Sequence, residues 1–216
     1  MQDRERTSEP TIPAHERVYR HLRNGIMCGE LQPGQSLTIR GIADIYGVSM
    51  TPAREAVRRL TAEGALTLSK TGRVTTPVLG FDRIEELASL RALLEPELAS
   101  RALPRVHSAL IDRLNRINST VDQMAVKRDA VGYIRSNLEF HRTLYLRAQA
   151  PAILAMAETV WLQMGPTMGA LYAKLQRQGA SDNHRAALSA LHAGDEPGLR
   201  LAIRADVTTG LRMLAQ

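Results

Sequence analysis

Apolar residues recur at helical spacing near the start of the chain. Between residues 14 and 28, Val18, Leu22 and Ile26 follow one another at intervals of four, with arginine and histidine on the other positions. This spacing predicts an amphipathic helix. The stretch "GELQPGQSL" (29–37) should end that helix, because glycine and proline interrupt helical structure.

Two further helices and a hairpin are predicted after this break. Residues 39–46 form a short helix that Gly47 ends as a C-cap, and "VSMTPAREAVRRL" (48–60) opens the next helix. The stretch "ALTLSKTGRVTTPV" (65–78) is rich in Thr, Val and Leu, with "KTGR" between two strand-like runs. That pattern predicts a β-hairpin with a basic tip.

The remainder of the chain is predicted to be helical. The expected helices lie near 82–102, 104–127, 129–149, 151–178, 181–193 and 195–214. The Gly165-Pro166 pair falls inside the fourth of these and predicts a kink. The predicted fold is therefore mainly α, with a disordered tail (1–13), a domain of three helices plus a hairpin (14–78) and an all-α bundle of about six helices (79–216).

Composition and charge narrow the class of partner. Hydrophobic residues make up 44% of the 216 residues and aromatic residues 4%, which favours a packed helical protein. The net charge of +6 suggests an anionic partner, with nucleic acid first and a membrane surface second. No apolar run reaches the length of a membrane span, the N-terminus lacks a signal-peptide core, and the single cysteine, Cys28, fits a reducing cytoplasm.

The stretch 48–60 has the chemistry of a DNA-reading helix. Two short helices joined by a tight glycine-containing turn make a helix-turn-helix pattern, and the hairpin that follows would be its wing. Ser49 is a good N-cap, and Thr51 and Pro52 suit a first turn whose free N–H groups can meet a phosphate. Arg54 can pair with guanine, and Glu55 can pair with Arg59 one turn later. The simpler alternative is a solvated, charged helix face.

Residues 29–74 resemble the DNA-binding domain of GntR-family bacterial transcription regulators. The resemblance rests on "GELQPGQSL", "GVSMTPAREA" and "LTAEGAL", which follow one another in the family's order. It implies a winged helix-turn-helix that binds double-stranded DNA. Together with the exposed face of the helix and the hairpin tip, it gives these expected contacts: Arg40, Ser49, Met50, Thr51, Pro52, Arg54, Arg58, Lys70, Gly72 and Arg73. Met50 stands where the family usually has arginine, so the operator sequence is expected to differ.

Residues 82–214 resemble the FCD-type ligand-binding domain of the FadR subfamily. Three stretches carry the likeness: "IEELASLRALLEPELASRAL", "NLEFHRTLYLRAQAPAIL" and "NHRAALSALHAGD". The resemblance implies a divalent metal ion, zinc or similar, on Asn137, His141, His184 and Asp206. Here Asn replaces the usual Asp and Asp replaces the last His. The alternative is a metal-free polar pocket in which both histidines are hydrogen-bonded.

The same resemblance implies an effector cavity and a homodimer. Arg91, His141, Tyr145 and His184 are its expected effector contacts, with Arg91 either gripping a carboxylate or pairing with Glu95. We therefore expect a cytoplasmic transcription regulator, a repressor and not an enzyme, that binds a palindromic operator and responds to a small organic acid. Two alternatives remain: an effector-independent DNA-binding protein, and a metal-dependent hydrolase built on His141, His184 and Asp206, which would leave the winged helix unexplained.

Overall fold

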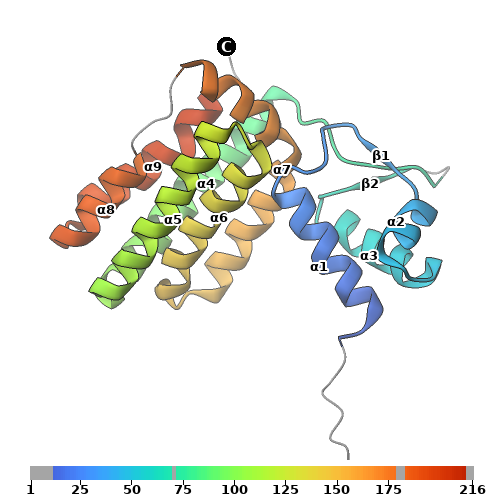
Figure 1. The fold of residues 1–216 in the computed structure, drawn as a ribbon, viewed down its shortest axis with the longest axis horizontal. Coiled ribbons are helices and arrows are strands. Elements are labelled where there is room, and N and C mark those ends of the chain that lie inside the picture. Colours follow the sequence, from blue (N-terminus) through green and yellow to red (C-terminus); the bar gives the residue numbers. More distant parts are fainter. Residues whose placement is uncertain (1–11, 70–71, 179–182, 213–216) are drawn as a thin grey trace, which may run out of the picture.

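A computed structural model of the chain describes residues 12–69, 72–178 and 183–212. Figure 1 shows a small N-terminal domain beside a larger helical bundle, with α1 between the bundle and the pair α2 and α3. The elements of the small domain are α1 (Ala14–Met27), β1 (Ser36–Leu37), α2 (Ile39–Tyr46), α3 (Met50–Ala62), β2 (Thr67–Leu68) and β3 (Val74–Thr75).

Local capping explains where the short helices begin and end. Thr38 caps α2 by accepting a hydrogen bond from the N–H of Gly41, and Gly47 ends the helix in the left-handed conformation with φ 61°. The predicted C-cap at Gly47 is thus confirmed. Ser49 holds the N-cap position of α3, again as predicted.

The sheet contains one strand more than the predicted hairpin. β3 lies in the middle and pairs antiparallel with both β2 and β1, in the order β1-β3-β2. Sequence reasoning missed β1 because its two residues, Ser36–Leu37, lie in a glycine- and proline-rich stretch and pair with a strand far along the chain.

The bundle contains α4 (Phe81–Ala102), α5 (Ser108–Lys127), α6 (Ala130–Tyr145), α7 (Pro151–Gln178), α8 (Asn183–Ala193) and α9 (Glu196–Arg212). These correspond to the six predicted helices, with small shifts at their ends. The helix predicted from 104 begins at Ser108, because Pro104 lies in a 3₁₀ turn and His107 provides the cap. The helix α7 runs unbroken through the Gly165-Pro166 pair. None of the described helices combines the length and apolar character that a membrane crossing requires.

Each domain has its own core, but α7 contributes to both. The core of the small domain gathers side chains from α1, α2, α3 and the sheet, and it also contains Leu162 of α7, which is fully buried. Trp161, the residue before it, belongs to the core of the bundle. Consecutive residues of one helix therefore hold the two domains together.

Candidate functional site

The helix α3 turns an apolar face to the domain core and a polar face to solvent. Its buried residues are Ala53, Ala56, Val57 and Leu60. Thr51, Arg54 and Arg58 are exposed on the other side. Burial fixes the helix to its domain, so the exposed arginines project from a rigid support.

The N-terminus of α3 is open to solvent. The hydroxyl of Ser49 makes no capping hydrogen bond, and Met50 opens the helix with 45% of its surface exposed. Pro52 is half-buried in the first turn. The free N–H groups and the positive end of the helix dipole suit this turn to a phosphate.

The other predicted DNA contacts lie on neighbouring elements of the same domain. Arg40 is exposed in the first turn of α2, and Gly72 and Arg73 are exposed just before β3. Gly72 has φ 80°, a left-handed conformation that suits glycine in the turn of the wing. Lys70 lies outside the described residues. Contact of these residues with DNA stays a prediction.

One arginine of α3 serves the fold instead. Arg59 lies 3.0 Å from Glu16 of α1 and 3.4 Å from Glu63, and its guanidinium stacks 3.5 Å above the ring of Tyr19. The predicted pairing of Arg59 with Glu55 is therefore wrong. The tertiary contact wins because Glu16 and Tyr19 offer Arg59 a charge and an aromatic face together.

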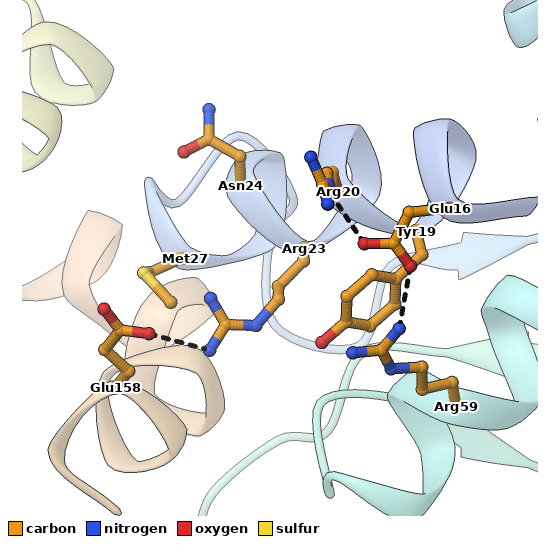
Figure 2. Close-up of a pocket in the computed structure, with 8 residues that line it drawn as sticks. All are labelled: Glu16, Tyr19, Arg20, Arg23, Asn24, Met27, Arg59 and Glu158. Atoms are coloured by element: carbon orange, nitrogen blue, oxygen red, sulfur yellow. Dashed lines mark hydrogen bonds and ion pairs between the residues drawn. The ribbon is translucent and has the colours of Figure 1, made fainter. Parts of the chain in front are cut away.

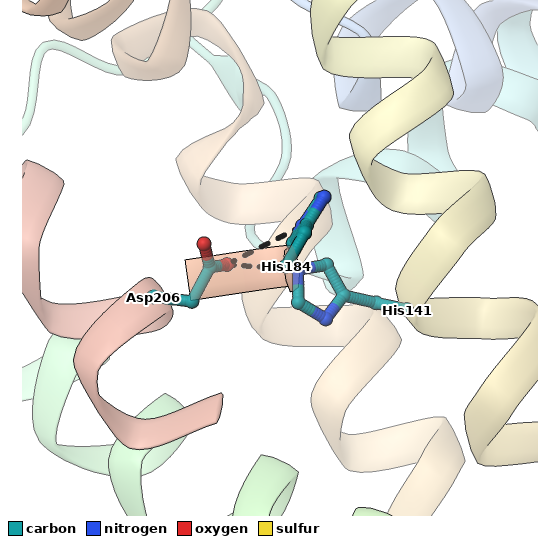
Figure 3. A group of neighbouring side chains, drawn as sticks. All are labelled: His141, His184 and Asp206. Carbon is teal, nitrogen blue, oxygen red and sulfur yellow. Dashed lines mark hydrogen bonds and ion pairs between the residues drawn. The ribbon is translucent and has the colours of Figure 1, made fainter. Parts of the chain in front are cut away.

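The bundle contains a group of three potential metal ligands. Figure 3 shows His141 of α6, His184 of α8 and Asp206 of α9 converging from three helices. Their ligand atoms lie within 4.8 Å of one another, both histidines are buried, and Asp206 is partly buried. Phe140 stacks on the ring of His184 with the centroids 4.0 Å apart, which fixes the ring plane.

Hydrogen bonding directs the lone pair of His184 into this group. Its Nδ1 lies 2.9 Å from Oδ1 of Asn118, and an amide oxygen only accepts hydrogen bonds, so Nδ1 carries the proton. Nε2 is then a lone-pair donor. It is buried without a hydrogen-bond partner among the described residues and lies 3.8 Å from the Asp206 carboxylate.

His141 is held in the same way by a longer chain. The Tyr145 hydroxyl donates to Glu95 at 3.0 Å, so its oxygen accepts from Nδ1–H of His141, also at 3.0 Å. Nε2 of His141 lies 3.0 Å from Oδ2 of Asp206. With the first proton on Nδ1, this close approach requires a second proton or a cation between the ring and the carboxylate.

The charge states follow from burial and proximity. Burial lowers the pKa of His184 to about 4, so the ring is neutral at pH 7. Burial alone would raise the pKa of Asp206, but His184, His141 and Arg91 outweigh it, and the pKa falls below its ordinary value. The site thus offers an ionised carboxylate and a neutral imidazole, the forms that bind metal ions.

Glu95 holds together a cluster of polar side chains next to His141, His184 and Asp206. It is fully buried and accepts hydrogen bonds from Arg91 at 2.6 Å, Trp161 at 2.9 Å and Tyr145 at 3.0 Å. Of the two predicted roles of Arg91, the salt bridge is therefore present. Arg91 also lines a small cavity, so its other N–H groups remain candidates for a ligand.

Asn137, the fourth predicted ligand, lines that same cavity with Arg91 and Trp161. Its ligation of a metal stays a prediction. Sequence reasoning missed Asn118 and Trp161 as polar partners of the site. Asn118 gave no signal because its partner is 66 residues away, and Trp161 has a large apolar ring that also belongs to the core of the bundle.

Known proteins resemble both halves of the chain. Residues 14–75 match "Bacterial regulatory proteins, gntR family", and residues 86–209 match the FCD domain. The HTH-type transcriptional regulator McbR of Escherichia coli is 27% identical over 202 residues, which cover 92% of this chain and 91% of that protein. The gluconate operon transcriptional repressor of Bacillus subtilis is 29% identical over 154 residues, which cover 70% of this chain and 60% of that protein. The solved structure of E. coli McbR/YncC has a TM-score of 0.87 at 27% identity, covering 95% of this chain and 99% of that one.

The depressed pKa of His184 predicts a loss of stability in mild acid. Between pH 6.5 and about 4, His184 is protonated in the unfolded chain but stays neutral in the folded protein. The free energy of unfolding should therefore fall as the pH falls. The loss is at most about 3 kcal/mol. Urea unfolding in a chelating buffer measures it. His184→Gln should flatten the slope, whereas His192→Gln, at an exposed position of the same helix, should not. Equal slopes in wild type and His184→Gln would contradict the assignment.

Proposed function

Because the chain belongs to the gntR family of bacterial regulatory proteins and carries an FCD domain, it is a DNA-binding transcription regulator, and we propose that it is a repressor released by a small organic acid. The proposed unit is a homodimer on a palindromic operator, in which each α3 enters one major groove of two successive half-sites. Its relatives in both comparisons are transcription regulators, which leaves the hydrolase alternative without support. The repressor role is supported by the name of the B. subtilis relative.

The observation that carries the DNA-reading role is the exposed face of α3 beside its uncapped N-terminus. Arg54 and Arg58 project from it one turn apart, and the free N–H groups of the first turn lie at its edge. Such a surface can bind a backbone phosphate and a base edge at once. Because Arg59 is held by Glu16 and Glu63, the reading face contains fewer free cations than the sequence suggests.

The effector role rests on the buried polar cluster of the bundle, in which hydrogen bonds link Arg91, Glu95, Tyr145 and His141, and on the small cavity that Arg91 also lines. We propose that Arg91, His141, Tyr145 and His184 contact the ligand, and that the N–H groups of Arg91 not engaged by Glu95 meet its carboxylate. Ligand binding would then shift the population of dimers toward a spacing of the two DNA-binding domains that no longer matches the operator. The second candidate function is DNA binding without an effector. It is favoured by the small, closed form of the cavity beside Arg91.

A divalent metal ion, zinc or similar, fits the donors that are present. The unpartnered Nε2 of His184 and the close pair of His141 and Asp206 both call for a cation. Asn118 and Tyr145 orient the two rings, as outer partners of metal-bound histidines do. A bound metal would supply a positive charge against which a carboxylate ligand can be held. Asn137 is the proposed fourth donor.

The DNA-reading role predicts opposite effects of two substitutions in α3. Arg54→Ala should weaken binding to the selected operator by about 1–3 kcal/mol per half-site, because a bidentate base contact is lost. Met50→Arg should tighten binding or change the preferred base, since it adds a cation at the exposed start of the helix. Operator selection followed by mobility shifts over a range of salt concentrations measures both.

The control for this pair is Arg113→Ala, which removes an exposed cation from α5 in the other domain. It should leave base preference unchanged. If neither Arg54→Ala nor Met50→Arg alters selectivity, α3 is not the reading helix. Binding that ignores rising salt would contradict the phosphate contacts.

The metal proposal predicts uptake of about one Zn²⁺ per chain by protein purified without a histidine tag. Asp206→Asn and His141→Gln should each lose most of the bound metal and the thermal stabilisation that it gives. Glu139→Gln, which neutralises an exposed carboxylate on the same helix as His141, should keep both. Elemental analysis and thermal melts decide the question, and a wild-type protein that retains no metal above background after loading refutes it.

A further inference from the structure

The small cavity beside Arg91 has one wall that belongs to the DNA-binding domain. Arg91 of α4, Leu138 of α6 and Trp161 of α7 line it, and so does Met27, the last residue of α1. Met27 is half-buried and packs against the cores of both domains. With a volume of about 10 Å³ the cavity has room for about one water molecule, so a larger ligand would have to displace part of its wall. A ligand that displaced Met27 would touch both halves of the chain.

The same residue also lines an open cleft between the two domains. Figure 2 shows this cleft, where Arg23 of α1 reaches Glu158 of α7 and Glu16 lies between Arg20 and Arg59, with Met27 beside Glu158 at one end. Met27 lines both spaces, so it lies at the place where the open cleft and the closed cavity approach each other.

The backbone at Met27 is fixed against α7. A β-carbon at Gly165 would lie 2.0 Å from the carbonyl oxygen of Ile26 and 2.8 Å from Cα of Met27, so the two helices touch backbone to backbone. The ion pair of Arg23 with Glu158, at 3.7 Å, holds them together one turn away. The movable part is therefore the methionine side chain, which is unbranched and has three rotatable bonds.

We propose that Met27 is the gate through which a small carboxylate passes from the interdomain cleft into the Arg91 cavity. In the closed state Arg91 is 5% exposed and Trp161 3% exposed, so neither can be reached from solvent. When the thioether rotates out of the boundary between the two spaces, the path to Arg91 opens. Its outer end is lined by Arg20 and Arg23, which are paired with Glu16 and Glu158. The identity of the ligand rests on the proposed function, whereas the gate itself does not.

The gate would place effector entry at the contact that positions the DNA-binding domain. Met27 ends α1, and α1 packs directly on α3, so a ligand held against Met27 lies one helix away from the reading helix. A ligand that keeps the Met27 side chain displaced therefore acts directly on the α1–α7 contact. Its effect does not depend on movement of the other helices of the bundle.

Trp161 allows a direct test, because it is the only tryptophan in the chain and it lines the cavity. Acrylamide, a small neutral quencher, serves as the probe of access. Met27→Ala should raise the quenching constant of Trp161 severalfold, since the passage is left open. Met27→Leu, which keeps a side chain of similar volume, should stay near wild type.

Leu138→Ala is the matched control. It removes a similar apolar volume from the cavity wall, but Leu138 does not line the cleft. Its quenching constant should stay near that of wild type, with folding of every variant checked by circular dichroism. If Leu138→Ala raises quenching as much as Met27→Ala, or if Met27→Ala changes nothing, Met27 is not the gate. Acrylamide is not an effector, so a gated cavity in a protein that no organic acid releases from DNA would count against the proposed function alone.

Discussion

The arrangement of the two domains depends on a backbone contact that only glycine permits. The carbonyl of Ile26 at the end of α1 occupies the space that a β-carbon of Gly165 would need. This contact lets α7 lie close enough for Leu162 to enter the core of the DNA-binding domain, while its neighbour Trp161 faces the bundle. Interiors this closely packed transmit small displacements instead of absorbing them. The position of α3 is therefore tied to α7, the helix that lines the cavity beside Arg91.

A second constraint on the structure is electrostatic and concerns Glu95, which accepts a hydrogen bond from Trp161. Glu95 is buried without water contact and satisfied by three donors, of which Arg91 supplies the compensating charge. Tyr145 in turn hydrogen-bonds to Nδ1 of His141, whose Nε2 faces Asp206. A buried network of this kind is stable only while every member is paired. The lone pair on His184 is the point at which the network is incomplete, and it is where a cation would complete it.

Local signals in the sequence predicted the elements well. Gly47 and Ser49 mark the turn of the helix-turn-helix through backbone preferences that act over a few residues, and helical periodicity located the six helices of the bundle. The strand β1 was not predicted, because its pairing partner, β3, is far away in the sequence. The convergence of His141, His184 and Asp206 was expected only through family resemblance.

Other features depend on contacts that no local pattern records. The Gly165-Pro166 pair predicts a kink, which stays a prediction, but nothing in the sequence indicates that Gly165 leaves room for the backbone of α1. Arg59 was assigned to Glu55 by spacing, but tertiary packing gave it Glu16 and Tyr19. The shared place of Met27 in the cavity and the cleft likewise follows from domain packing, which periodicity does not specify.

In the proposed mechanism the DNA-binding domain and the cavity beside Arg91 are coupled through α1 and α7. Coupling between two sites is reciprocal, so whatever the ligand does to DNA affinity, DNA must do to the ligand site. The direct measurement is the emission and acrylamide quenching of Trp161 with and without the operator duplex, with a scrambled duplex as control. We expect operator DNA to shift the emission or the quenching constant of Trp161, and the scrambled duplex to leave both unchanged. Identical Trp161 signals with bound operator, scrambled duplex and no DNA would contradict it.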